Sequence, residues 1–126
     1  MRETIAVAIG GMIGSVLRFW VSVAIGQRLG GFMPFGTLAV NVAGCFAIGV
    51  LSGFMQRNQA FSPTWELAIR AGFLGGLTTF STFGLEVFEL GQSERWFLAM
   101  IIVTANILLG LGAVGLGQVV ARLFHI

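Results

Sequence analysis

Residues 75–84 read GGLTTFSTFG, and this stretch decides how the chain can fold. It lies near the middle of an apolar run, 67–90, that is long enough to cross a bilayer, which takes about 20 residues. Glycine and threonine are poor residues for a helix interior, and non-helical backbone at membrane depth is tolerated only where protein buries it or water reaches it. We therefore predict that a helix over 67–90 is broken at its middle. The alternative is a kinked packing helix whose four hydroxyl groups bond back to its own carbonyls.

The composition of the whole chain is that of a membrane protein. Of its 126 residues 56% are hydrophobic and only 10% are charged, with a mean hydropathy of +0.94. A soluble domain carries about 25% charged residues, so this chain has too little polar surface for a water-facing exterior. Its high pI comes from seven arginines that are spread singly along the chain. Nucleic-acid binding needs basic residues gathered on one face, and we do not expect it here.

Four apolar stretches predict an all-α membrane protein with a single transmembrane domain over residues 1–126. The short connections between them hold turn formers or charge. The predicted spans are about 4–26, 36–56, 67–90 and 96–121. The third span carries Glu86 and Glu89 in its last turns, where we expect the membrane interface to solvate them.

The sequence holds one cysteine and one histidine, and no pair of acidic residues is placed for hydrolytic work. The only cysteine, Cys45, lies inside an apolar run, and the only histidine is the penultimate residue. One thiol and one imidazole supply neither a disulfide framework nor a metal-binding cluster within the chain. We do not expect an enzyme.

The distribution of arginine barely specifies an orientation in the membrane. One side would carry four of them and the other side three, counting those in the loops and near the ends of the spans. Because positive charge in short loops sets orientation, such a chain is expected to insert both ways, and two opposite copies can pair as an antiparallel homodimer. Glycines spaced four apart allow close helix packing and favour contact with another copy. They are Gly10 and Gly14, Gly49 and Gly53, and Gly72 and Gly76.

Phe80 and Phe83 bracket Ser81 and Thr82 in the third span. Residues three apart share a helix face, and the edge of an aromatic ring is electropositive. Ring edges beside hydroxyl groups can line a path for a small anion, and weak multiple contacts suit an ion that must enter and also leave. The alternative is that both rings are ordinary core or lipid-contact residues.

Three polar side chains interrupt the other spans. Asn41 in the second span and Asn106 in the fourth carry amide donors that could face an anion, or could bond to each other across helices. Arg18 in the first span could extend to the interface or bond backbone carbonyls, and a vestibule or structural role fits it better than a pore ligand.

Together these motifs resemble the CrcB/Fluc family of fluoride channels, in order and spacing over essentially the whole chain. The residues that carry the resemblance are Gly10-Gly11-Met12-Ile13-Gly14 with Arg18, Gly36-Thr37-Leu38 through Asn41 and Gly44, and the run from Gly72 to Phe83. The third of these motifs is highly specific, whereas the first alone is weak.

The resemblance implies an antiparallel, dual-topology homodimer with two pores along the subunit interfaces. In it, Phe80 and Phe83 present ring edges to fluoride, with Asn41, Ser81 and Thr82 nearby. Thr37 and Asn106 complete the expected lining of the pore. The resemblance further implies a structural sodium ion at the dimer centre, held by backbone carbonyls of Gly75 and Thr78 from both copies.

The expected function is passive, fluoride-selective export from the cytoplasm across the cell inner membrane, which lowers fluoride toxicity. One rival is a four-span transporter of the small multidrug-resistance type, which needs a membrane-embedded carboxylate that the middle of each predicted span lacks. Another rival is a non-transporting scaffold subunit, which would leave the polar aromatic centre of the third span unexplained.

Overall fold

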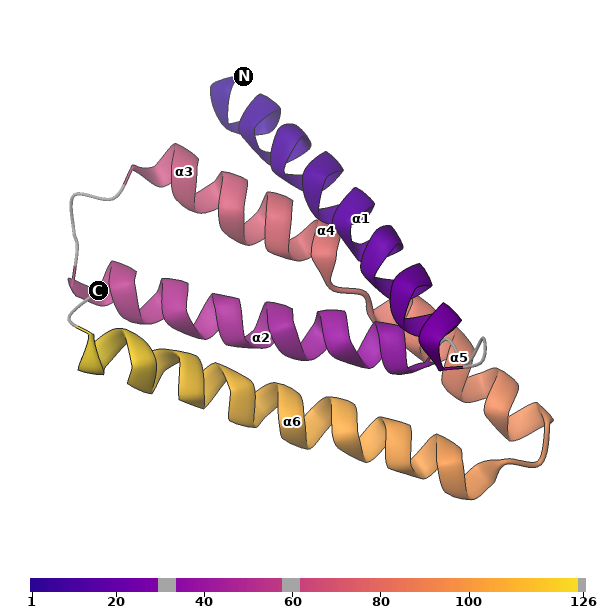
Figure 1. The fold of residues 1–126 in the computed structure, drawn as a ribbon. Helices are drawn as coiled ribbons and strands as arrows, with labels where there is room; N and C mark the ends of the chain where they lie inside the picture. The colour runs from indigo at the N-terminus through magenta and orange to yellow at the C-terminus, as the bar shows by residue number, and fades with distance from the viewer. Residues whose placement is uncertain (30–33, 58–61, 125–126) are drawn as a thin grey trace.

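The computed structural model describes residues 1–29, 34–57 and 62–124, and every regular element within these ranges is a helix (Figure 1). The expected all-α fold is thus confirmed. The elements are α1 (Arg2–Arg28), α2 (Pro34–Arg57), α3 (Pro63–Leu67), η1 (Ala68–Leu74), α4 (Gly75–Leu77), α5 (Phe80–Gln92) and α6 (Trp96–Leu123).

Three of the described helices are long and apolar enough to cross a membrane. These stretches are Arg2–Arg28, Pro34–Gln56 and Trp96–Leu123, and their mean hydropathies are 1.7, 1.9 and 2.3. They cover the spans expected at 4–26, 36–56 and 96–121. Much of their outer surface is exposed apolar side chain, as expected for helices whose solvent is lipid.

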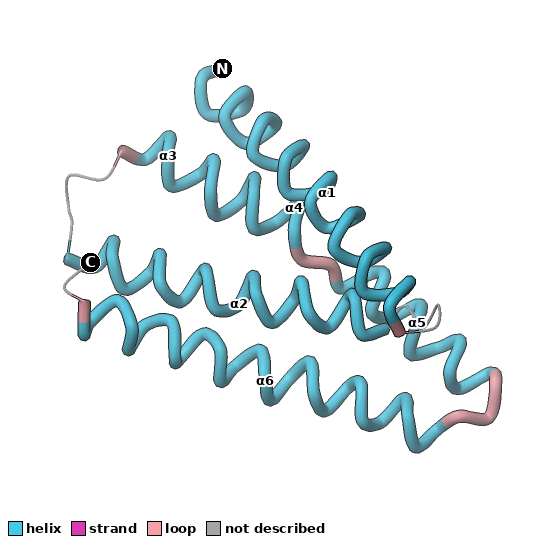
Figure 2. Tube along the Cα trace, viewed as in Figure 1, coloured by secondary structure: helices cyan, strands magenta, loops and turns pink. Residues whose placement is uncertain are grey.

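The segment expected to form the third span consists of several short elements in series. Helix α3 leads into the seven-residue π-helix η1 and then into the single turn α4. Thr78 and Thr79 are not helical, and α5 begins directly after them. Figure 2 shows this interruption as a short loop between α4 and α5, close to the middle of the fold. The residue pattern did not indicate the π-helix, a conformation that is often found at functional sites.

The helices pack in two pairs. Helices α2 and α6 run side by side in the same direction, and α1 lies along η1 and α4 (Figure 1). Glycine permits both close approaches: a Cβ on Gly14 would overlap the carbonyl oxygen of Phe73, and a Cβ on Gly49 would overlap that of Val114. Our expectation that the glycine pairs favour contact with a second copy therefore needs correction, because helices of the same chain occupy these faces.

Two small apolar cores hold the interruption in place. Val40, Leu74 and Leu77 join α2 to the helical segments before it. A second core joins α5 to α6 after it, and consists of Phe83, Leu90, Ala99 and Ile102. Thr78 and Thr79 are therefore held at both ends, because a buried core lies on either side of them along the chain.

Candidate functional site

The candidate site is built around the two extended residues between α4 and α5. Thr78 has φ −88° and ψ 157°, and Thr79 has φ −151° and ψ 123°. The Thr78 amide makes the last bond of the preceding helix, to the carbonyl oxygen of Leu74 at 3.0 Å. The Thr79 side chain then begins the next helix, because its Oγ1 accepts a hydrogen bond from the Thr82 amide at 3.2 Å, which is the usual role of an N-cap threonine.

Asn41 on α2 pairs with the extended backbone through both ends of its amide. Its Oδ1 accepts from the Thr79 N–H at 2.8 Å, and its Nδ2 donates to the Thr79 carbonyl at 3.1 Å. The pair replaces the helical hydrogen bonds that the interruption removes. Buried backbone groups need such partners, so one asparagine stabilises the non-helical conformation of Thr79.

Asn106 on α6 extends this network to a third helix. Its Oδ1 accepts from Asn41 Nδ2 at 3.0 Å, while its own Nδ2 donates to the Ile102 carbonyl at 3.1 Å. Both hydrogens of Asn41 Nδ2 therefore bond within the protein, as in the interhelical alternative that the sequence left open. Donation from Asn41 or Asn106 to an anion stays a prediction.

Three hydroxyl groups follow one another at the start of α5. Thr79 Oγ1 lies 3.3 Å from Ser81 Oγ and donates to Thr82 Oγ1 at 3.1 Å. Thr79 is buried, whereas Ser81 and Thr82 are exposed. Hydroxyl groups can rotate to donate or accept, so this row can offer hydrogens to an ion that passes along the exposed side.

The two phenylalanines lie beside this row and differ sharply in exposure. Their ring centroids are 5.5 Å apart and the ring planes are inclined by 54°. Phe80 is 82% exposed, and Phe83 is 9% exposed and belongs to the core between α5 and α6. Of the two rings, only that of Phe80 is accessible on the surface of the single chain.

A groove of about 290 Å³ joins these groups. It lies where α2, α5 and α6 meet, and is lined by Asn41, Cys45, Thr78, Thr79, Phe80, Phe83, Asn106 and Ile107. Four of the predicted pore residues, Asn41, Phe80, Phe83 and Asn106, thus share one concave surface with the two extended threonines. Ser81 and Thr82 lie next to the groove in the chain but do not line it.

Thr37 and Glu86 form a second polar pair, between α2 and α5. Thr37 Oγ1 donates to Glu86 Oε1 at 2.7 Å, and the two residues are 2% and 7% exposed. Glu86 Oε2 is buried without a partner among the residues that the structure describes. The expectation that the interface solvates Glu86 was wrong: α5 starts only at Phe80, and Glu86 lies on its buried stripe with Phe83 and Leu90. Glu89, in contrast, is exposed.

Arg18 on α1 approaches the other side of the interruption. Its Nη1 lies 3.5 Å from the Thr78 carbonyl oxygen, and the side chain is half-buried. Of the two placements that the sequence left open, the structure has the one in which arginine bonds backbone. In the part of the chain that is described, His, Cys, Asp and Glu form no cluster that could hold a metal ion, so any cation at this site would depend on carbonyl oxygens.

Comparison with known proteins identifies the family. Residues 5–118 match the family described as CrcB-like protein, Camphor Resistance (CrcB). This chain belongs to the CrcB family. Curated members that resemble it are each named fluoride-specific ion channel FluC. The protein from Acidobacterium capsulatum is 43% identical over 92% of this chain and 93% of its own length.

Other relatives agree over similar lengths. The Serratia proteamaculans protein is 49% identical over 88% of this chain and 84% of its own length. The Citrifermentans bemidjiense protein is 39% identical over 97% of this chain and 98% of its own length. CrcB membership together with the apolar helices makes this chain a multi-pass membrane protein.

Sequence reasoning missed three residues in and around the candidate site. Thr79 makes most of the hydrogen bonds of the polar network, but the sequence marked it only as part of a poor helix interior. Cys45 lines the groove, whereas the sequence placed it only inside an apolar run. Glu86 was read as an interfacial acid. Its spacing from Phe83 and Leu90, three and four residues, is the helical periodicity that could have shown it on a buried stripe.

Proposed function

We propose that this CrcB-family chain is a passive, fluoride-selective channel that exports fluoride from the cytoplasm and so lowers its toxicity. The observation that carries the proposal is the groove at Thr78–Phe83, where ring edges and hydroxyl groups lie next to one another on an interrupted helix. The name shared by the relatives, a fluoride-specific ion channel, supports the same function.

The chemistry of the lining suits a small, strongly hydrated anion. Electropositive ring edges and hydroxyl hydrogens attract an anion without a fixed positive charge, so that it can leave as well as enter. The guanidinium of Arg18 is turned to the Thr78 carbonyl. Hydrogen fluoride is a weak acid that crosses membranes uncharged and dissociates in the cytoplasm. The negative interior potential then drives the anion outward, and conduction needs no energy source in the protein.

The proposal includes an antiparallel homodimer in the cell inner membrane, in which the interruption of the third span lies inside the bilayer. Phe80 supports a second copy, because a ring that is 82% exposed on a single chain needs a covering surface before it can line a closed path. Residues of both copies would then line each pore. The nearly equal numbers of arginines on the two sides allow the two copies to insert in opposite orientations.

We also propose a structural sodium ion on the carbonyls of Gly75 and Thr78. In a continuous helix these oxygens would accept from the amides of Thr79 and Thr82. Those amides donate instead to Asn41 Oδ1 and Thr79 Oγ1. The interruption thus frees the two carbonyl groups, and unwound backbone carbonyls are known ligands of sodium in membrane proteins. When bound, the ion would supply positive charge at the dimer centre, and Arg18 would compete for the Thr78 oxygen.

A polar cavity supports water access to one end of the protein. It measures about 450 Å³ and lies between α2, α6 and the segment of α3 and η1. Its polar lining consists of Ser52, Gln56, Glu66, Arg70 and Gln118. Glu66 and Arg70 form an ion pair at 3.4 Å in which the arginine side chain is 62% exposed. We propose it as part of an aqueous vestibule.

A second candidate function rests on Glu86. A buried carboxyl group in a membrane-spanning segment is the feature that a proton-coupled, small multidrug-resistance-type transporter requires. Its Thr37 bond and its place on the packed face of α5 favour a structural role instead. A non-transporting scaffold subunit is the third possibility.

Liposome efflux separates the three. Vesicles loaded with fluoride or chloride and containing the purified protein are followed with ion-selective electrodes. A channel releases fluoride and retains chloride when potassium is made permeant by an ionophore. A transporter of cationic drugs releases neither halide, but takes up a cationic dye in exchange for protons when a proton gradient is imposed. A scaffold neither releases a halide nor takes up the dye.

A further inference from the structure

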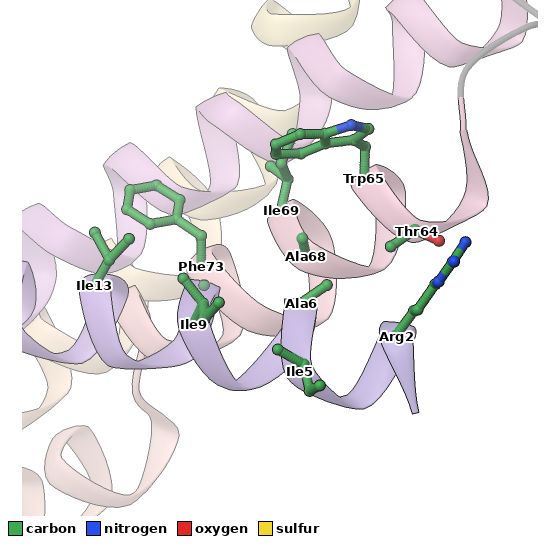
Figure 3. Close-up of a pocket in the computed structure, with 11 residues that line it drawn as sticks. Arg2, Ile5, Ala6, Ile9, Ile13, Thr64, Trp65, Ala68, Ile69 and Phe73 are labelled. Atoms are coloured by element: carbon green, nitrogen blue, oxygen red, sulfur yellow. The ribbon is translucent and has the colours of Figure 1, made fainter.

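A long apolar groove lies on the outside of the chain, away from the candidate pore. It runs between the first half of α1 and the segment of α3 and η1, and has a volume of about 480 Å³ (Figure 3). Its sides are Ile5, Ala6, Ile9 and Ile13 on α1, facing Ala68, Ile69 and Phe73. Gly10 forms its floor, where a Cβ would overlap the Ala68 carbonyl oxygen.

The length of the groove matches one leaflet of a bilayer. Arg2 and Ile13 mark its two ends on α1, and eleven residues of helix rise about 16 Å. The hydrocarbon core of a bilayer is about 30 Å thick, so one leaflet contributes about 15 Å. A groove that starts at the membrane surface with Arg2 therefore ends close to the midplane.

The surface end of the groove is polar and positively charged. Arg2, Thr64 and Trp65 gather there, and in Figure 3 the Arg2 side chain extends toward Thr64. Trp65 is the kind of residue that resides at headgroup level. In the described part of the chain Arg2 has no carboxylate partner, and the ion pair between Glu66 and Arg70 lies in the other cavity. An apolar groove one leaflet long, with a positive charge at its surface end, is complementary in shape and charge to an anionic phospholipid.

Part of the segment formed by η1 and α4 is exposed outside the groove, where a second copy could bind. Ala71 and Gly75 are also exposed but do not line the groove, so a protein partner on the Gly75 side and a lipid in the groove can be present together. We propose that the groove binds one acyl chain of an anionic phospholipid, whose phosphate is held by Arg2, Thr64 and Trp65. The proposal does not depend on fluoride conduction.

Quenching of Trp65 fluorescence tests the site. The chain has three tryptophans, and replacing Trp20 and Trp96 with Phe leaves Trp65 as the only emitter. This protein is placed in bilayers that contain phosphatidylglycerol or phosphatidylcholine brominated on the acyl chain near the headgroup, at equal mole fractions. We expect a relative binding constant about fivefold higher for phosphatidylglycerol, equivalent to about 1 kcal/mol for one basic residue at an anionic surface.

Two variants locate the effect. Arg2→Gln is expected to reduce the preference to about one, whereas Arg28→Gln, at the far end of α1, is expected to retain it. Ala6→Phe fills the groove and is expected to lower quenching by both lipids. Equal quenching by the two lipids, a preference that survives Arg2→Gln, or equal losses in both arginine variants would overturn the proposal. Absence of quenching by either lipid would also overturn it, since a second copy would then cover the groove.

Discussion

Asn41 and Thr79 are joined by two hydrogen bonds, amide oxygen to backbone N–H at 2.8 Å and amide nitrogen to backbone carbonyl at 3.1 Å. The Asn41 side chain on α2 thereby supplies the hydrogen-bond partners that a continuous helix would give to the backbone of Thr79, 38 positions away. The groove, the row of hydroxyl groups and the two freed carbonyls all follow from the conformation that this pair stabilises.

Asn41→Ala is expected to destabilise the fold. It leaves the amide and carbonyl of Thr79 without partners and removes the bond to Asn106. We expect the free energy of unfolding to fall by about 1–3 kcal/mol, measured by equilibrium unfolding in mixed micelles. Ser81→Ala, which alters an exposed hydroxyl, is the control and should stay close to wild type. Equal stability of the two variants would show that Asn41 does not support the extended backbone.

Thr37 and Glu86 are expected to be energetically coupled. Thr37→Val, Glu86→Leu and the double variant form a double-mutant cycle in which each single change removes the hydrogen bond. We expect a coupling energy of about 1–2 kcal/mol because each side chain is the other's partner in a buried site. Thr104→Val, at an exposed position, serves as the uncoupled comparison with Glu86→Leu. Additive effects for Thr37 and Glu86 would mean that the 2.7 Å bond contributes little in the bilayer.

Two glycine-to-alanine substitutions are expected to act in opposite directions. Gly14→Ala places a Cβ against the Phe73 carbonyl and must push α1 away from η1, which we expect to cost about 1–3 kcal/mol. Nothing lies within 4 Å of the Cβ position of Gly112. Gly112→Ala should therefore stabilise α6 by about 0.5–1 kcal/mol. Thermal denaturation followed by size-exclusion chromatography checks both, and loss of stability in both variants would contradict the packing.

Reporters fused to the C-terminus are expected to show both orientations in cells. Four arginines against three give almost no bias. Gln92→Arg at the end of α5, together with Ser93→Arg in the turn that follows, reverses the difference. This change should increase the fraction of chains with the turn in the cytoplasm. If the unmodified chain placed its C-terminus on one side only, the antiparallel dimer would lose its basis.

The sequence was sufficient for the helices that hydropathy alone determines. Spans one, two and four lie within α1, α2 and α6, since charge ends each apolar run near a helix end. The two threonines at which the backbone leaves the helix lie inside the stretch 75–84, where glycine and threonine fit a helix interior poorly.

Features that depend on packing could not be predicted in the same way. The π-helix over Ala68–Leu74 arises where η1 packs against α1, and no residue type in that stretch marks it. Asn41 was recognised as a polar group that needs a partner. That this partner is Thr79 depends on how close α2 lies to the interruption, which only the packed structure shows. Glu86 was misplaced because its depth was judged from its closeness to the end of the predicted span, and not from its helical spacing to Phe83 and Leu90.

The central claim is that fluoride passes along the aromatic edges beside the interruption, and Phe80 tests it most directly. Phe80 is 82% exposed and Phe88, on the same helix, is 63% exposed, so replacing either ring with isoleucine should leave the fold intact. Fluoride efflux from loaded liposomes should fall at least tenfold, equivalent to about 1.4 kcal/mol in the barrier, for Phe80→Ile, and should stay at the wild-type rate for Phe88→Ile. Wild-type efflux with Phe80→Ile, in protein of unchanged stability, would contradict the account.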